Sequence, residues 1–240
     1  MKKVLSIASL PLASNVCNQQ LREVFKTNVF SLAHVIMALK AESLLHKHYR
    51  TTELYFIISG QGVLTHGTTE TRVSAGACIE IPPTVEHKLK NTGEGELVHF
   101  VVALPPFRPE DVEIIKYSRE IMRFGSFVLP ETFVGLDGGR VYEFPKISWQ
   151  HLGMSLAYGY LEPKQRARSH FHKETKEWYF IVEGMGRVFL DDEVYEIQAG
   201  ELITVPAGVK HSLQNTTSVP LRVLCICEPH FSEDDFYFAD

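Results

Sequence analysis

Seven chemically demanding residues recur at one constant offset in this chain of 240 residues. Each member of the first set has a counterpart 124 residues later, and no insertion or deletion interrupts the match. Coincidence at seven such positions is not a serious alternative, so the chain contains two copies of one structural unit, each of about 100–120 residues. The paired positions are His46 and His170, His48 and His172, Glu53 and Glu177, Gly60 and Gly184, Gly76 and Gly200, Pro82 and Pro206, and His87 and His211.

The histidines and the glutamate of each copy have the pattern of a metal site. Two histidines one residue apart on an extended segment point the same way, because side chains alternate across a strand. The segment 53–59, which begins with the glutamate, is rich in β-branched, aromatic and apolar residues and is predicted as a strand. The predicted ligands are His46, His48, Glu53 and His87 in the first copy, and His170, His172, Glu177 and His211 in the second.

The donor set narrows the choice of metal. Three imidazoles and one carboxylate fill four positions of an octahedron and leave two for water, dioxygen or a chelating substrate. The absence of cysteine from the predicted ligands disfavours a closed structural zinc site. We expect one divalent transition metal ion in each copy, with Fe(II), Mn(II), Ni(II), Co(II) and catalytic Zn(II) as the alternatives.

Each copy resembles a cupin domain. The pattern H-x-H-x4-E-x6-G is followed in both copies by G-x5-P-x-G-x2-H-x3-N, with one departure: Thr84 replaces the glycine present at Gly208. The glycine that often opens the first motif is replaced by Lys40 and Lys164, and neither change removes a ligand. The resemblance implies an all-β bicupin with two tandem barrels of the double-stranded β-helix, or jelly-roll, type. It names no reaction, because this fold hosts many chemistries.

A short helix is predicted between the two barrels. Pro109 followed by two acidic residues is typical of a helix start, and Gly125 would end the helix. Elsewhere, many short strands with glycine and proline turns favour small antiparallel barrels. The predicted domains are an N-terminal barrel over 1–108, a helical connector over 109–124 and a C-terminal barrel over 125–240.

The N-terminal segment and the cysteines bear on the compartment. The basic start followed by an apolar run resembles a short signal peptide, but Ser6, Ser9 and Pro11 interrupt the run. We therefore interpret this segment as the first strand of the first barrel. The cysteines do not fit a disulfide framework and are predicted to be reduced core thiols, which favours the cytoplasm. They are Cys17, Cys78, Cys225 and Cys227.

Charge and hydropathy limit the partners. The net charge is −5 without a basic block, which argues against nucleic acid, because phosphates require clustered lysine and arginine. No run of about 18 apolar residues exists, so no membrane span is expected. Open barrel edges usually need cover. We expect the barrels to pack on each other and to exchange the N-terminal strand, with a homodimer as a weaker expectation.

A few further residues are candidates for contact with a substrate. Tyr55 and Tyr179 lie two residues after the ligand glutamates and therefore share their face of the strand. They would hydrogen-bond a substrate, or line the core with the hydroxyl satisfied locally. Arg166 and Arg168 precede the second ligand pair and would clamp an anionic substrate, or belong to a solvated loop. His34 is a further candidate at the first site, with a structural role as the alternative.

Two classes of function follow. The first is a metal-dependent enzyme that acts on a small, anionic or sugar-like metabolite by dioxygenation or isomerisation. The second is a non-catalytic metal-containing protein that binds a small molecule. Two intact ligand sets favour the enzyme. The second copy is similar to sugar-phosphate-isomerase-like cupins, whereas oxalate-degrading bicupins match less well, because their arginine just before the ligand pair is not reproduced at the same spacing. The second site, with its complete motif, is the better candidate for chemistry.

Overall fold

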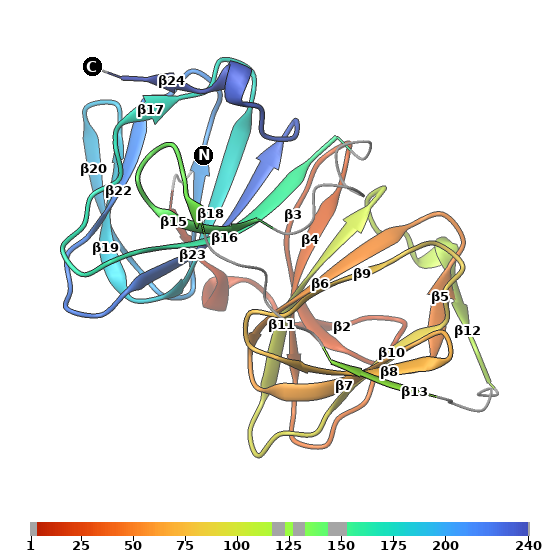
Figure 1. The fold of residues 1–240 in the computed structure, drawn as a ribbon. Helices are drawn as coiled ribbons and strands as arrows, with labels where there is room; N and C mark the ends of the chain where they lie inside the picture. The colour runs from red at the N-terminus through yellow and green to blue at the C-terminus, as the bar shows by residue number, and fades with distance from the viewer. Residues whose placement is uncertain (1–3, 117–122, 127–132, 144–152, 240) are drawn as a thin grey trace. The chain divides into compact units, whose positions relative to one another are not determined.

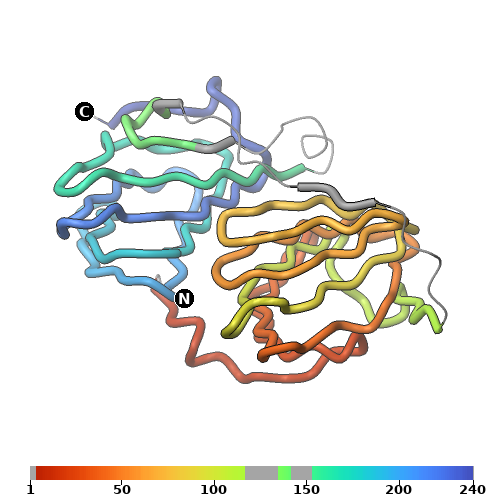
Figure 2. Tube along the Cα trace, turned by 60° about the horizontal axis from the view of Figure 1, so that its bottom comes forward, coloured from red at the N-terminus to blue at the C-terminus, as the bar shows by residue number. Residues whose placement is uncertain are grey.

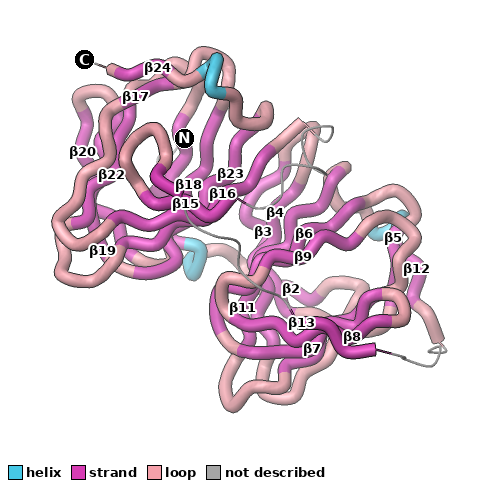
Figure 3. Tube along the Cα trace, viewed as in Figure 1, coloured by secondary structure: helices cyan, strands magenta, loops and turns pink. Residues whose placement is uncertain are grey.

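The structure is a computed structural model that describes residues 4–116, 123–126, 133–143 and 153–239. The chain divides into two compact units. The N-terminal unit is Leu10–Leu129, and the C-terminal unit combines Met1–Ser9 with Pro130–Asp240. Each unit consists of two facing sheets, and the described helices are single 3-10 turns (Figures 1 and 3). The predicted all-β fold with two tandem barrels is therefore confirmed.

The N-terminal unit contains two six-stranded sheets. All of their described pairings are antiparallel except that of β13 with β8. The first sheet, in spatial order, is β2 (Ala13–Ser14), β3 (Gln20–Lys26), β4 (Ser31–Met37), β11 (Leu97–Leu104), β6 (Thr52–Ser59) and β9 (Cys78–Ile81). The second sheet is β12 (Val112–Ile114), β5 (His46–His48), β10 (His87–Asn91), β7 (Gln61–His66), β8 (Thr69–Ser74) and β13 (Arg123–Ser126).

The C-terminal unit repeats this arrangement with a seven-stranded and a five-stranded sheet. The first, in spatial order, is β1 (Val4–Ser6), β21 (Glu201–Val205), β18 (Lys176–Glu183), β23 (Leu221–Glu228), β16 (Ser155–Leu161), β15 (Arg140–Glu143) and β14 (Phe133–Val134). The second is β20 (Glu193–Gln198), β19 (Met185–Leu190), β22 (His211–Asn215), β17 (His170–Phe171) and β24 (Tyr237–Phe238). The 3-10 turns among the described residues are η1 (Ile7–Ser9) and η4 (Glu233–Asp235) in this unit and η2 (Pro109–Asp111) in the N-terminal unit.

The core of each unit lies between its two sheets. In the N-terminal unit, Tyr55 and Val35 from one sheet pack in the same buried cluster as Leu64 and Leu89 from the other. In the C-terminal unit, Tyr179 and Val188 do the same. Because alternate side chains of each strand point into this core, the ligand residues are carried toward the barrel interior on the same face as the apolar residues.

The N-terminal strand does not belong to the first barrel, contrary to the interpretation from sequence. β1 pairs antiparallel with β21 of the C-terminal unit, where Val4 lies opposite Ile203. In Figure 2 the red N-terminal segment ends beside the blue strands of this unit. An edge strand exposes unpaired N–H and C=O groups, and an apolar segment that covers the edge satisfies them. The expected transfer of the N-terminal strand to the other barrel is thus observed at the edge of β21, whereas the packing of the barrels on each other stays a prediction.

The predicted helical connector over 109–124 is not helical over its described residues beyond one 3-10 turn, and residues 117–122 lie outside the described part of the chain. The described part of this segment begins with one 3-10 turn, η2, and then forms β12 and the start of β13. β12 pairs with the ligand strand β5, so that Val112 lies opposite His48 and Ile114 opposite His46. In the C-terminal unit, β24 pairs with β17 in the same way. Pairing with an open strand edge overrides the weak helical signal of the local sequence.

Among the described residues, no helix is long and apolar enough to cross a membrane.

Candidate metal centres

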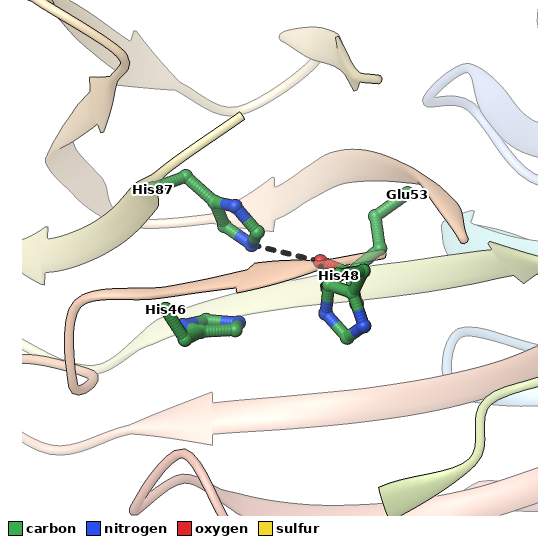
Figure 4. Close-up of side chains that lie close together, drawn as sticks. All are labelled: His46, His48, Glu53 and His87. Atoms are coloured by element: carbon green, nitrogen blue, oxygen red, sulfur yellow. Dashed lines mark hydrogen bonds and ion pairs between the residues drawn. The ribbon is translucent and has the colours of Figure 1, made fainter. Parts of the chain in front are cut away.

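The first centre brings together His46 and His48 from β5, Glu53 from β6 and His87 from β10. Figure 4 shows the three rings and the carboxylate converging on one point. Nε2 of His87 lies 2.9 Å from Oε2 of Glu53, and Nε2 of His48 lies 3.3 Å from the same oxygen. All four residues are buried, and one donor atom from each lies within 4.8 Å of the others.

The second centre has the same design. His170 comes from β17, His172 follows it, Glu177 lies on β18, and His211 begins β22. Nε2 of His211 lies 2.8 Å from Oε2 of Glu177, and Nε2 of His172 lies 3.6 Å from this oxygen. The hydroxyl of Tyr179 donates a hydrogen bond of 2.8 Å to that same Oε2. The four donors again lie within 4.8 Å of one another, and all four residues are buried.

Backbone carbonyls fix the orientation of most of the rings. Nδ1 of His46 lies 2.7 Å from the carbonyl of Leu44, and Nδ1 of His87 lies 2.9 Å from that of Val85. His170 and His211 bond in the same way to the carbonyls two residues before them. A proton on Nδ1 leaves the lone pair on Nε2, which then faces the metal position.

Several buried ring nitrogens fit a metal ion better than they fit the surrounding protein. Nε2 of His48, His172 and His211 has no hydrogen-bond partner among the described residues, because the nearby glutamate oxygens lie outside hydrogen-bond geometry. A buried polar atom without a hydrogen-bond partner costs free energy of folding. These ring nitrogens lie around the glutamate carboxylate, so they indicate a binding position for a ligand there. A divalent transition metal satisfies them, and the donor set is one that such a metal accepts.

At His46, His170 and the two glutamates, the environment favours the protonation state that binds metal. Burial, with help from the neighbouring imidazole, lowers the pKa of His46 and of His170 to about 4. Burial alone would raise the pKa of Glu53, but its hydrogen bond with His87 and the nearby imidazole of His48 hold it well below its usual range. The pKa of Glu177 is lowered in the same way beside His211. Neutral imidazole and ionised carboxylate are the forms that coordinate a metal.

One turn holds the third histidine against the ligand pair in both copies. The backbone N–H of Thr84 donates to the carbonyl of His48 at 2.6 Å, and that of Gly208 donates to the carbonyl of His172 at 2.6 Å. Thr84 has φ of 69° and Gly208 has φ of +82°, so threonine adopts the left-handed conformation here that glycine adopts in the second copy. The departure from the motif therefore leaves the turn intact.

Sequence reasoning missed two aspartates that support the centres. The Asp235 carboxylate accepts hydrogen bonds from the backbone N–H groups of the loop between the ligand pair and Glu177, and its carbonyl accepts one of 2.9 Å from Nδ1 of His172. The Asp111 carboxylate bonds the equivalent loop of the first copy through Thr51. The signal was present in the sequence, since both residues lie in matched acidic segments that close the two repeats.

A cavity of about 340 Å³ opens onto the second centre and is lined by all four of its ligands. Gly159 and Val223 line it, whereas the equivalent positions of the first copy hold Val35 and His99, which are fully buried. Larger side chains thus occupy the corresponding part of the first barrel. The mostly apolar walls also contain polar groups, among them Asp137, Arg140, Ser155, Ser212, Cys225 and Cys227.

The two tyrosines predicted to face the interior are both buried there. Tyr179 lines the cavity and its hydroxyl donates to Glu177, which agrees with the alternative of a hydroxyl satisfied locally, and its contact with a substrate stays a prediction. Tyr55 lies in the core of the first unit, with its ring 6.0 Å from that of His87 and 5.1 Å from that of His99. The structure therefore brings Tyr179 to the cavity and Tyr55 to the core of the first unit.

The two arginines lie beside aromatic rings. The guanidinium of Arg166 lies 3.8 Å from the ring centre of Phe189, and that of Arg168 lies 3.6 Å from that of Phe238. Both residues are exposed, and neither is among the described residues that line the cavity. Arg140 is the arginine in that lining. The role of Arg166 and Arg168 toward a substrate stays a prediction.

His34 is separated from the first centre. It lies on β4 next to Val35, and both Val35 and Met37 point into the core. Because side chains alternate along a strand, the ring of His34 points to the other face of the sheet. There it makes an edge contact with Phe100 at 5.5 Å between ring centres. The structural alternative stated for this histidine agrees with its position.

The chain belongs to the cupin family. The model of the cupin domain matches residues 33–103 and again 158–227, which places one match over each metal centre. The protein is therefore a bicupin with two buried three-histidine, one-glutamate clusters.

Among curated relatives, an uncharacterised protein of Methanocaldococcus jannaschii is 36% identical over 101 residues, which are 40% of this chain and 81% of that protein. Protein SchB of Streptomyces halstedii is 28% identical over 80 residues, 33% of this chain and 58% of that protein.

Solved structures of oxalate decarboxylase have a similar fold. The enzyme of Bacillus subtilis superposes with a TM-score of 0.72 at 16% identity, over 97% of this chain and 78% of that one. The enzyme of Lactobacillus farciminis, solved as a formate complex, gives 0.72 at 15% identity, over 97% and 88% of the two chains. At this level of identity the likeness concerns the fold.

Proposed function

We propose that this protein is a metal-dependent enzyme whose chemistry takes place in the C-terminal barrel, on a small metabolite that reaches the metal through oxygen donors. The observation that carries the proposal is the cavity of about 340 Å³ that ends on His170, His172, Glu177 and His211. Enclosed cavities of about 300–1,000 Å³ with apolar walls and a few polar groups are typical of small-molecule sites. This one is near the small end of that range, so the substrate is compact.

The four ligands would hold a divalent metal ion and leave two positions for a substrate. When bound, such an ion supplies Lewis-acid polarisation of a carbonyl or hydroxyl oxygen. Manganese is the first candidate to test, because the Bacillus subtilis oxalate decarboxylase, whose fold is similar, has Mn(II) centres. The substrate's remaining groups would contact the apolar walls, and Arg140 in the cavity lining would pair with an anionic group.

Isomerisation, or a related proton transfer, is the reaction that the cavity supports best. Asp137 lies in the cavity wall, and burial, followed by the nearby charge of Glu177, raises the pKa of its carboxyl. A carboxyl held in the wall of such a cavity can exchange a proton with a bound substrate. Its side chain is anchored, since the backbone N–H of Gly139 donates a hydrogen bond of 3.0 Å to it. Dioxygenation is the second candidate, because four protein ligands leave the two adjacent positions that this reaction needs.

The test is an activity screen of the full-length protein loaded anaerobically with Mn(II) or Fe(II). Small hydroxy acids, keto acids and sugar phosphates are the substrates, and an oxygen electrode monitors each reaction. Turnover without oxygen consumption supports isomerisation, and stoichiometric oxygen consumption supports dioxygenation instead. Asp137→Asn should lower the rate of an isomerisation by about 10²–10⁴-fold while leaving metal content unchanged.

A matched pair of variants tests the location of the chemistry. His172→Ala should abolish turnover, because it removes a ligand of the open centre, whereas His48→Ala should leave turnover largely intact. Loss of turnover in His48→Ala with retention in His172→Ala would place the chemistry in the first barrel. Saturable binding of a metabolite with no turnover under any metal would instead identify a non-catalytic binding protein.

A further inference from the structure

We propose that Glu177, Cys225 and Cys227 form a second metal site in the C-terminal barrel, for a soft or borderline cation such as Zn(II), directly beside the histidine centre. This site is separate from the reaction proposed above and does not depend on it. Two thiols and one carboxylate oxygen are its protein donors.

The distances between the donor atoms carry this inference. Sγ of Cys225 and Sγ of Cys227 are 3.7 Å apart, and they lie 3.5 Å and 3.6 Å from Oε1 of Glu177. With Zn–S of about 2.3 Å and Zn–O of about 2.0–2.2 Å, a tetrahedron has S–S edges of about 3.7–3.8 Å and S–O edges of about 3.5–3.7 Å. The three atoms are therefore already spaced as three corners of one zinc coordination sphere.

The strands explain this spacing. Cys225 and Cys227 are two residues apart on β23, so both thiols point to the barrel interior. β23 pairs with β18 in a register that places Cys227 opposite Glu177 and Cys225 opposite Tyr179. Backbone pairing thus holds both thiols next to the glutamate carboxylate, and their convergence needs no movement of a loop.

The glutamate divides its two oxygens between the two clusters. Oε2 faces the ring nitrogens of His172 and His211 and accepts from Tyr179, whereas Oε1 faces the two thiols. A carboxylate in this position can bridge two metal ions. The two thiolates and the shared carboxylate would offset three of the four positive charges, which limits repulsion between neighbouring divalent ions.

The two thiols are accessible to a cation that enters the cavity. Both line the cavity that opens onto the histidine centre. Cysteine binds Zn(II) as a thiolate, so each thiol would release its proton to solvent when the ion binds. Thiolate donors select Zn(II) over a hard ion such as Mn(II).

The first barrel supplies the matched control. Val101 and Ala103 occupy the positions of Cys225 and Cys227, and they lie opposite Tyr55 and Glu53 in the same strand register. The double variant Cys225→Val with Cys227→Ala therefore installs side chains that the same fold already accommodates. It leaves every ligand of the histidine centre in place.

The experiment loads reduced full-length protein with Cd(II) or Co(II), which report thiolate ligation by a sulphur-to-metal charge-transfer band. Wild type should bind three Cd(II) per chain and show the band, and the double variant should bind two and show none. Both proteins should take up two Mn(II). Two Cd(II) without a charge-transfer band in wild type, or a band that persists in the variant, would overturn the proposal.

Alkylation keeps the proposal testable if the variant does not fold. Wild-type protein is treated with iodoacetamide with and without Zn(II), and modified cysteines are identified by mass spectrometry. Zn(II) should slow labelling of Cys225 and Cys227 at least tenfold and leave Cys17 and Cys78, which are buried in the other unit, unchanged. Equal labelling of Cys225 and Cys227 in both conditions contradicts a thiolate site.

Discussion

The hydroxyl of Tyr179 donates to Oε2 of Glu177 at 2.8 Å, and the same oxygen lies 2.8 Å from Nε2 of His211. A buried phenol therefore stabilises the charged form of the carboxylate that faces the ring nitrogens. Burial and the charge of Glu177 raise the pKa of Tyr179 well above its usual range, so the phenol remains a donor at all ordinary pH values.

Tyr179→Phe should lower the free energy of unfolding of the metal-free protein by about 2 kcal/mol, because it removes a buried hydrogen bond to a charged group. Urea denaturation followed by circular dichroism measures this change. Tyr237→Phe is the control, since Tyr237 is only partly buried and its ring stacks on Phe171. Equal stability of Tyr179→Phe and wild type would show that this hydrogen bond contributes nothing to the fold.

Asp235→Ala should weaken Mn(II) binding at the second centre by about 10–100-fold while sparing the first. Its carboxylate accepts the N–H groups of Lys173 at 2.9 Å and Thr175 at 3.0 Å, and this contact holds the loop that carries the ligands. Asp111→Ala should have the converse effect at the first centre, where Thr51 is the partner. Titration of Mn(II), followed by the electron paramagnetic resonance signal of the free ion, measures both affinities. Uniform weakening of both centres by either variant contradicts this local role.

Reconstitution with Mn(II) should give two ions per chain, because Mn(II) accepts the imidazole and carboxylate donors but not the thiols. His48→Ala and His172→Ala should each reduce this number to one, and the double variant should bind none. Elemental analysis after removal of free metal provides the measurement. A protein that stays free of metal after anaerobic loading with Mn, Fe, Co, Ni and Zn would falsify both centres.

His99 should make the first barrel sensitive to acid. Burial lowers its pKa to about 3, with Glu53 acting in the opposite direction and His34 in the same one. Its unfolded pKa is about 6.5, so between these values the unfolded chain binds a proton that the folded barrel does not. The contribution of neutral His99 to the free energy of unfolding is therefore fully present above about pH 6.5 and is lost progressively as the pH falls.

His99→Leu tests this effect, because leucine fills a similar volume and cannot titrate. Between about pH 8 and pH 5, wild type should lose about 2 kcal/mol more free energy of unfolding than the variant. Urea denaturation at each pH gives the difference. Parallel curves for the two proteins would mean that His99 keeps its ordinary pKa in the folded barrel.

Local spacing made the metal centres predictable. His46 and His48 are two residues apart, and so are Glu53 and Tyr55. Because a strand has a period of two, the two side chains of each pair are predicted to share a face. The constant offset gives the same prediction for the second copy. Even the departure at Thr84 left the centre intact, since a left-handed threonine reproduces the turn at Gly208.

The sequence by itself therefore determined the two barrels, the family and the ligand sets. Only the tertiary structure decided that β1 covers β21, that β12 pairs with a ligand strand, and that Glu177 meets two thiols across β18 and β23. It also decided that an open cavity lies in the second barrel. Strand pairing between distant segments depends on which edges remain free, and cavity volume depends on the sum of many side chains. Neither the pairing of distant strands nor the volume of a cavity follows from a local repeat in the sequence.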